Sequence, residues 1–171
     1  MAKETGEKTR SIWEKKIYGT GSPKIDKVKS IKKEDVVISE EWKKKIYDEN
    51  GNMKKIILYN TTVTGFLQNG DRMVDKIRRV FEVFKNSKGV VLLWRPHPLI
   101  SATLDSMRPE LSKEYAKLVE EYKNADFGIY DDTADLNSSI ALSDAYFGDR
   151  SSLVQLFRAV NKPIMIENVN I

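Results

Sequence analysis

An arginine and the only histidine of the chain stand between prolines in Arg95-Pro96-His97-Pro98, directly after the apolar run VVLLWR at residues 90–95. A guanidinium group matches the geometry of a phosphate, and an imidazole can donate a hydrogen bond from either ring nitrogen. Because the prolines stiffen the backbone, Arg95 and His97 are predicted to bind a pyrophosphate group. The alternative interpretation is that Arg95 pairs with a nearby carboxylate and His97 packs in a turn.

A second polar segment, GDRSSL at residues 148–153, stands where a short strand is expected to give way to a helix. Ser151 and Ser152 offer hydroxyl groups and unpaired backbone N–H groups at the helix start, where the helix dipole favours an anion. They are therefore predicted to bind phosphate, with Asp149 and Arg150 as further candidates for contact with the same ligand. A serine here is also a common helix N-cap, and that alternative stays open for Ser151.

A third segment, DDTAD at residues 131–135, is acidic and follows another expected strand. Paired carboxylates can hold a metal ion or act as acid and base, but no histidine or cysteine accompanies them, so no metal site is expected. Thr133 and Asp135 are instead candidates for contact with a nucleotide base or ribose. Capping of the next helix by Thr133 or Asp135 explains the same residues equally well.

The elements that must position these segments follow from the alternation of short apolar runs with amphipathic runs, which is typical of a parallel sheet covered by helices. Strands are expected at 55–61, 90–95, 127–131, 145–149 and 163–168, and helices at 39–48, 73–84, 109–122, 132–143 and 151–160. A further strand is expected from residue 16, turning through Gly19 and Gly21 into a helix. The predicted fold class is α/β, a Rossmann-like parallel sheet flanked by helices, in which ligands gather at the carboxyl ends of the strands.

The chain has 171 residues, 40% of them hydrophobic, which suffices for one core. We expect a flexible arm at residues 1–10 and a single nucleotide-binding domain at residues 11–171, cut from a longer polypeptide. The absence of cysteine excludes disulfides, thiolate nucleophiles and Cys-ligated zinc, and it fits a cytoplasmic location. No run of about 18 apolar residues occurs, so no membrane span is expected.

Lysine is concentrated in residues 22–33 and 40–55, although the formal net charge is only +4. Such segments attract phosphate-rich ligands or the anionic face of a membrane, but they are also typical of a solvated surface. No motif of a nucleic-acid-binding domain occurs, so nucleic acid is not an expected partner.

Four segments carry a resemblance to a known family through their order: GSPKID (21–26), KIILYNTT (55–62), LLWRPHP (92–98) and DLNSSIALSDAYFGDRSSLVQLFRAVNKPIMI (135–166). From about Gly21 to Glu167, the chain resembles the C-terminal domain of bacterial CDP-glycerol glycerophosphotransferases. These enzymes have two Rossmann-like domains in a GT-B arrangement. They build the poly(glycerol phosphate) chains of teichoic acids at the cytoplasmic face of the membrane.

The resemblance implies that Arg95 and His97 contact the donor pyrophosphate and that Ser151 and Ser152 bind its phosphates, with Asp149 shaping the turn. It implies displacement at the phosphorus of CDP-glycerol with loss of CMP, and no cofactor. The catalytic base and an anionic polymer or lipid-linked acceptor would come through the other half of the enzyme. The fragment alone would then bind donor without turning it over, and the whole protein would be peripheral at the inner face of the membrane.

Two departures from the family pattern keep alternatives open. Arg150 stands where the family has a tyrosine, and Asn60–Thr64 replace a proline-threonine-tryptophan-arginine stretch. The first alternative is the sugar-nucleotide-binding domain of a GT-B glycosyltransferase or of a UDP-GlcNAc 2-epimerase-like protein. The second is a non-catalytic module whose lysine-rich face binds anions without a nucleotide preference.

Overall fold

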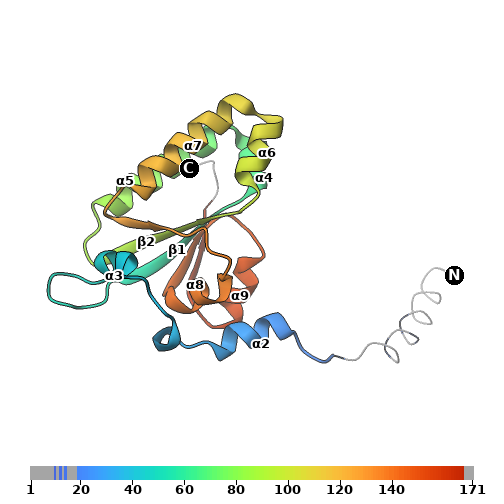
Figure 1. Cartoon of the computed structure of the whole chain (residues 1–171). Helices are drawn as coiled ribbons and strands as arrows, with labels where there is room; N and C mark the ends of the chain where they lie inside the picture. The colour runs from blue at the N-terminus through green and yellow to red at the C-terminus, as the bar shows by residue number, and fades with distance from the viewer. Residues whose placement is uncertain (1–9, 11, 13, 15–18, 168–171) are drawn as a thin grey trace.

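The computed structural model describes residues 10, 12, 14 and 19–167 of the chain. Within this part, five parallel strands form one sheet with helices on both of its faces (Figure 1). The order in the sheet is β3-β2-β1-β4-β5, with β1 (Lys55–Thr61), β2 (Val90–Pro96), β3 (Gly128–Tyr130), β4 (Ala145–Gly148) and β5 (Ile164–Ile166). The predicted α/β class with a Rossmann-like parallel sheet is confirmed.

Alternate side chains of the strands point to opposite faces of the sheet, and each face carries its own apolar cluster. Tyr59 and Trp94 face a layer made of α4 (Val63–Asn69), α5 (Asp71–Lys85), α6 (Ile100–Met107) and α7 (Pro109–Lys123). Leu58 and Leu93 face a layer made of α2 (Pro23–Ser30), the 3₁₀ turn η1 (Lys33–Asp35), α3 (Glu40–Ile46), α8 (Leu136–Leu142) and α9 (Leu153–Ala159). The central strands β1 and β2 are therefore buried on both sides.

Helix α5 shows how the apolar pattern is satisfied. Met73, Ile77, Val80 and Phe81 recur at helical spacing and are all buried against the sheet. Lys76 lies in the same stripe, three residues after Met73, and is only 2% exposed. A cation is thus buried on the face of α5 that the pattern assigns to the core.

The strand order makes β1 the point where the sheet changes its direction of growth. From β1 the chain adds β2 and β3 on one side, and it later adds β4 and β5 on the other side. Asn60 at the end of β1 consequently pairs with Arg95 of β2 and with Gly148 of β4. In open α/β sheets, ligands bind outside the carboxyl ends of the strands at such a switch point.

All five of the strands expected between residues 55 and 168 are present, and the last three are shorter than expected. Helices α3, α8 and α9 also begin later than expected, since Ser39 and Asp135 cap the first two of them. The sequence pattern does not predict α4 and α6, because each is one or two turns long and buries too few residues to show a stripe.

Two predictions concern residues near the start of the chain. The strand expected from residue 16 lies outside the described residues, and so does the arm at residues 1–10 except for Arg10, whose Nε donates to Glu14 at 2.8 Å. The boundary between an arm and a domain therefore stays a prediction.

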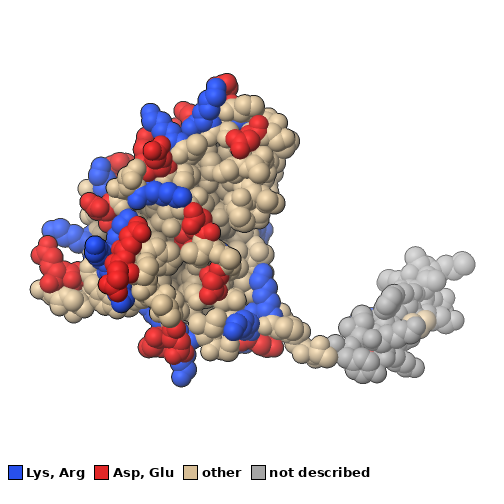
Figure 2. Space-filling model, viewed as in Figure 1, with Lys and Arg blue, Asp and Glu red and all other residues tan. Residues whose placement is uncertain are grey.

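The lysine-rich segments contribute to a surface on which charges of both signs are interspersed (Figure 2). Lys43 of α3 lies 2.7 Å from Glu40 on the same helix, with both side chains exposed. Lys33 of η1 lies 2.9 Å from Asp144, with both partly buried. Some lysines of these segments thus lie at the surface and pair with nearby acidic residues.

Gly148 allows β4 to close onto β1. Its φ is +126°, a conformation that residues with a Cβ rarely adopt. A Cβ at this position would lie 2.3 Å from the carbonyl oxygen of Asn60 and 2.9 Å from its nitrogen. The close approach of the two strand ends therefore requires glycine.

Gly148→Ala should destabilise the protein more than Gly89→Ala, which provides a matched control. Gly89 also has a positive φ of 78°, but a Cβ there would meet no atom within 4 Å. The backbone conformation alone should lower the free energy of unfolding by about 1–2 kcal/mol in Gly89→Ala, and the clash with Asn60 should add to this loss in Gly148→Ala. Urea unfolding followed by circular dichroism measures both variants, and equal losses would contradict the steric argument.

Candidate functional site

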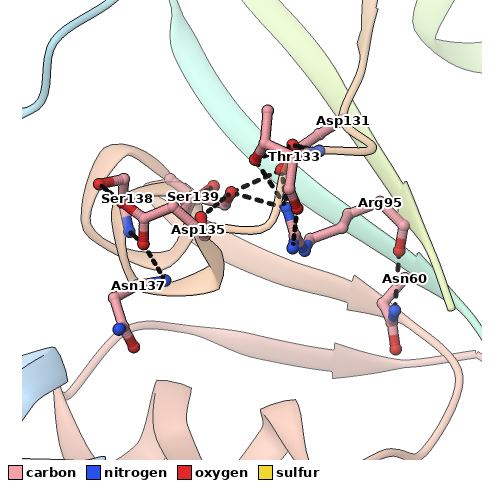
Figure 3. Close-up of polar contacts among 9 residues, drawn as sticks. Asn60, Arg95, Asp131, Thr133, Asp135, Asn137, Ser138 and Ser139 are labelled. Carbon is pink, nitrogen blue, oxygen red and sulfur yellow. Dashed lines mark hydrogen bonds and ion pairs between the residues drawn. The ribbon is translucent and has the colours of Figure 1, made fainter. Parts of the chain in front are cut away.

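Arg95 leaves the carboxyl end of β2 and reaches the loop that follows β3 (Figure 3). Its Nη1 lies 2.6 Å from Oδ2 of Asp131, and its Nη2 donates to the carbonyl oxygen of Thr133 at 2.6 Å. Nη1 also lies 3.3 Å from the Thr133 hydroxyl and 3.2 Å from the Ser139 hydroxyl. The interpretation in which Arg95 pairs with a local carboxylate is therefore confirmed.

Asp131 holds this arginine in a fixed position. Its side chain is 0% exposed, and its Oδ1 accepts hydrogen bonds from the backbone N–H of Thr133 at 3.1 Å and from the Thr133 hydroxyl at 2.7 Å. The Ser139 hydroxyl donates to Oδ2. Among the described residues, Nε of Arg95 has no hydrogen-bond partner, so this N–H group stays available to a ligand.

His97 lies exposed just beyond β2. Its backbone N–H donates to the carbonyl oxygen of Thr61 at 2.9 Å, and its Nδ1 accepts a hydrogen bond from the N–H of Leu99 at 3.2 Å. A neutral imidazole that accepts at Nδ1 carries its proton on Nε2. His97 is thus packed in a turn, as the alternative interpretation predicted, and it also presents an N–H donor at the surface.

The turn between β4 and α9 carries Arg150, Ser151 and Ser152. The Ser151 hydroxyl accepts a hydrogen bond from the N–H of Leu153 at 3.2 Å. The N-cap of α9 is Ser152, so the alternative interpretation of Ser151 as the N-cap is wrong. Ser152 is exposed, and its side chain makes no capping hydrogen bond. Arg150 is exposed and forms no ion pair within the part of the chain that the structure describes.

Asp149 is buried, and both of its carboxylate oxygens have partners inside the protein. Oδ1 lies 2.8 Å from Nζ of Lys76, while Oδ2 accepts hydrogen bonds from the N–H and the hydroxyl of Thr62 at 2.7 and 2.9 Å. These contacts join α5, the β1–α4 turn and the β4–α9 turn. Asp149 thereby shapes the turn that carries Ser151, and its oxygens are occupied by internal partners.

A second carboxylate, that of Glu167, lies near the same lysine. Its Oε2 is 3.4 Å from Nζ of Lys76, farther than the oxygen of Asp149. Burial raises the pKa of Glu167 above its ordinary value, and the charge of Lys76 only partly opposes this rise. Asp149 is therefore the principal counterion of Lys76.

Asn60 connects the two loops that are predicted to bind phosphate. Its Nδ2 donates to the carbonyl oxygen of Arg95 at 2.8 Å, and its Oδ1 lies 3.3 Å from the Tyr146 hydroxyl. The same hydroxyl donates to the carbonyl oxygen of Asp149 and lies 3.2 Å from the Ser151 hydroxyl. A chain of polar contacts thus runs from the Arg95 loop to the Ser151 turn along one edge of the sheet.

Asp135 caps α8, as one interpretation of the acidic segment predicted (Figure 3). Its Oδ1 accepts hydrogen bonds from the N–H groups of Asn137 and Ser138 at 3.1 and 3.2 Å, and the Ser138 hydroxyl donates to Oδ2 at 2.6 Å. The Ser138 hydroxyl, followed by the backbone N–H groups, lowers the pKa of Asp135. The loop 131–135 is therefore ordered by its own hydrogen bonds.

The larger cavities lie away from these residues. One of about 500 Å³ lies between α2, α8 and α9, and one of about 750 Å³ lies between α5 and α7. A smaller cavity of about 240 Å³ borders the edge and is lined by Trp42, Tyr130 and Thr133 among others. Arg95, His97, Ser151 and Ser152 line none of these three, so the candidate site is an open edge of the sheet.

Two features are absent from the described residues. No three His, Asp or Glu side chains there lie close enough together to hold a metal ion. None of the described helices is both long enough and apolar enough to cross a bilayer.

The sequence pattern does not predict the roles of three residues on which this edge depends: Lys76, Asn60, and Asp131 as the particular carboxylate that Arg95 contacts. Lys76 has a visible signal, since a lysine inside the apolar stripe of α5 needs a buried counterion. Asn60 has a weaker one, as a polar residue that is buried at the end of the apolar run of β1.

The parallel sheet and its switch point define the chain as a Rossmann-like α/β domain. Arg95 and Arg150 stand at the carboxyl edge of this sheet, where an anion can bind. A family model described as CDP-Glycerol:Poly(glycerophosphate) glycerophosphotransferase matches residues 1–170. The chain belongs to this family, and the resemblance inferred from the sequence is confirmed. No curated protein and no solved structure matches the chain.

Lys76→Met should remove the buried ammonium while keeping an unbranched side chain. Asp149 would then be buried without its counterion, which should lower the free energy of unfolding by about 3–5 kcal/mol. The double variant Lys76→Met/Asp149→Asn should recover much of this loss, and Lys117→Met on the exposed side of α7 serves as the control. Urea unfolding of wild type, Lys76→Met, Asp149→Asn, the double variant and the control measures the coupling, and single-variant losses that simply add in the double variant would contradict the ion pair.

Asp135→Ala should lower the free energy of unfolding by about 1 kcal/mol at pH 7, because α8 loses its N-cap. Since the pKa of Asp135 is lowered in the folded protein, its contribution is present above the unfolded value of about 4. That contribution is lost as the pH falls through the folded value. The difference from wild type should therefore shrink below about pH 4, whereas a constant difference would contradict the capping role. Asp132→Ala, in the same loop, provides the control.

Proposed function

We propose that the carboxyl edge of the sheet binds the diphosphate of a CDP-glycerol donor. Arg95 contributes its Nε–H group, His97 contributes Nε2–H, and the β4–α9 turn contributes Ser151 and Ser152. Arg150 adds a second cation beside the serine pair. The observation that supports this assignment best is the chain of contacts from Arg95 through Asn60 and Tyr146 to Ser151 at the switch point of the sheet.

The spacing of the two loops suits a diphosphate. Strands β2 and β4 flank β1 on opposite sides, so their ends are two strand spacings, or about 10 Å, apart. Side chains that reach inward from both loops can therefore contact a ligand with two linked phosphate groups. The cations come from opposite sides, Arg95 from the β2 loop and Arg150 from the β4 loop.

The loop after β3 extends the same edge toward the nucleoside part of the donor. It is joined to Arg95 through Asp131 and through the carbonyl oxygen of Thr133. Thr133 and Asp135 are assigned to this part of the donor, beside the small cavity that Trp42 and Tyr130 line.

The chemistry that these residues serve is transfer of a glycerophosphate unit. The acceptor hydroxyl forms a bond to the phosphorus that carries glycerol, the bond from that phosphorus to the bridging oxygen breaks, and CMP leaves with the electron pair. Arg95, Arg150 and the N–H donors of the edge neutralise the charge that develops on the leaving phosphate. The acceptor is a glycerophosphate polymer of the teichoic acid type, and no residue of this chain is assigned as the base that takes the hydroxyl proton.

Titration calorimetry of the protein with CDP-glycerol, CMP, UDP-GlcNAc and UDP tests this proposal. We expect cytidine-selective binding that weakens about tenfold in Arg95→Lys, because one charge-assisted hydrogen bond is lost. His97→Ala should weaken it as well without touching the Asp131 network, and Arg78→Lys on the surface of α5 should leave it unchanged. Thermal unfolding of each variant separates lost binding from lost folding.

The other outcomes of this titration identify the alternatives. Preference for uridine nucleotides would favour a sugar-nucleotide-binding domain. Binding that depends on salt but not on the base, and that survives His97→Ala, would favour an anion-binding module.

A further inference from the structure

The cavity of about 500 Å³ lies at the amino edge of the sheet, opposite the edge that carries Arg95. Its walls come from α2, η1, the end of α8, the end of α9 and the turn before β5. Three lysines from three of these segments line it, Lys29, Lys33 and Lys162, and Asp144 is the single acidic residue among its lining residues. Figure 2 shows basic side chains near α2 beside acidic ones.

The carboxylate of Asp144 already has partners for both of its oxygens within the protein. Oδ2 of Asp144 lies 2.9 Å from Nζ of Lys33 and accepts a hydrogen bond from the N–H of Ile56 at 2.8 Å, while Oδ1 lies 3.7 Å from Nζ of Lys55. Burial alone would raise the pKa of Asp144, but the Ile56 N–H and Lys33 outweigh it and lower that pKa. Asp144 therefore neutralises no more than one of the lysines.

Lys162 is held in the cavity and forms no ion pair with any of the described residues. Its Nζ donates to the carbonyl oxygens of Ile140 and Ala141 at 2.6 and 2.7 Å, which are neutral acceptors at the end of α8. Burial, followed by the nearby charge of Lys33, lowers the pKa of Lys162, and the charge of Asp144 only partly opposes this. An ammonium has three N–H donors, so one remains for a ligand.

Lys29 adds a further positive charge to the cavity, because it is exposed and forms no ion pair within residues 19–167. The remaining walls are largely apolar and include Val28, Ile140 and Val160. The volume falls in the range of about 300–1,000 Å³ that small-molecule sites occupy. Excess positive charge above apolar walls suits an anion that carries a short carbon chain.

We propose that this cavity binds the phosphate group of a glycerophosphate unit, on the edge of the domain opposite the donor site. The nature of the ligand rests on the proposed function, whereas the charge of the site does not. The ligand can come from free glycerol phosphate or from a poly(glycerophosphate) chain. In the second case, the domain holds the polymer at a distance from the reacting end.

The test is a titration of the ¹⁵N-labelled chain with glycerol 3-phosphate and with a short poly(glycerophosphate), followed by amide chemical shifts. We expect saturable shifts at Asn161 and Lys162. Lys29→Gln should raise the Kd about threefold, as for loss of one partly exposed ionic contact, while Lys117→Gln on α7 should not change it. Lys29 makes no contact that the fold depends on, so this variant tests the site even where Lys162→Gln affects folding.

The source of the ligand follows from the comparison of the two titrations. Tighter binding of the polymer assigns the site to the acceptor chain, and equal binding assigns it to the free phosphoester. Arg95→Lys should leave both titrations unchanged, so that a failure of donor binding and a failure of this site are seen separately. Equal effects of Lys29→Gln and Lys117→Gln, shifts spread over all lysines, or no saturable shift at Asn161 and Lys162 would overturn the proposal.

Discussion

The buried ammonium of Lys76 is the constraint on which the carboxyl edge of the sheet depends. An unpaired charge in the interior costs several kcal/mol, so α5 can pack against the sheet only when a carboxylate meets it there. Asp149 meets it at 2.8 Å and is itself fixed by two hydrogen bonds from Thr62. One ion pair thus sets the positions of α5 and of the turns on both sides of the switch point.

A second ion pair, Arg95 with Asp131, repeats this principle on the other side of Asn60. Here the cation is only partly buried, with a side chain 14% exposed, so the pair fixes the guanidinium without removing it from solvent. Polar groups along the edge therefore reach their positions through internal partners and not through a ligand. Such preorganised donors stabilise an anion without a cost of reorganisation at the moment of binding.

The sequence predicts the parts of this arrangement that depend on local pattern. Apolar runs locate the strands, helical spacing locates α5 and α7, and the shared edge of parallel strands brings the segments of Arg95 and Ser151 together. Partner choice is not local: Lys76 and Asp149 are 73 residues apart, and Tyr146 and Asn60 are 86 apart. A lysine in the apolar stripe of α5 predicts a buried counterion. The chain has 25 acidic residues, and the sequence alone does not indicate which of them it is.

The central place of β1 has a consequence for how the chain is made. Ile57 of β1 pairs with Ala145 of β4, which is synthesised much later. Until β4 is made, that side of β1 is open to pairing with a foreign strand. During this interval Asp149 is also still missing, so Lys76 has no buried counterion and α5 lacks the partner that its packing requires. The final packing of α5 therefore depends on the same segment of the chain that completes the sheet beside β1.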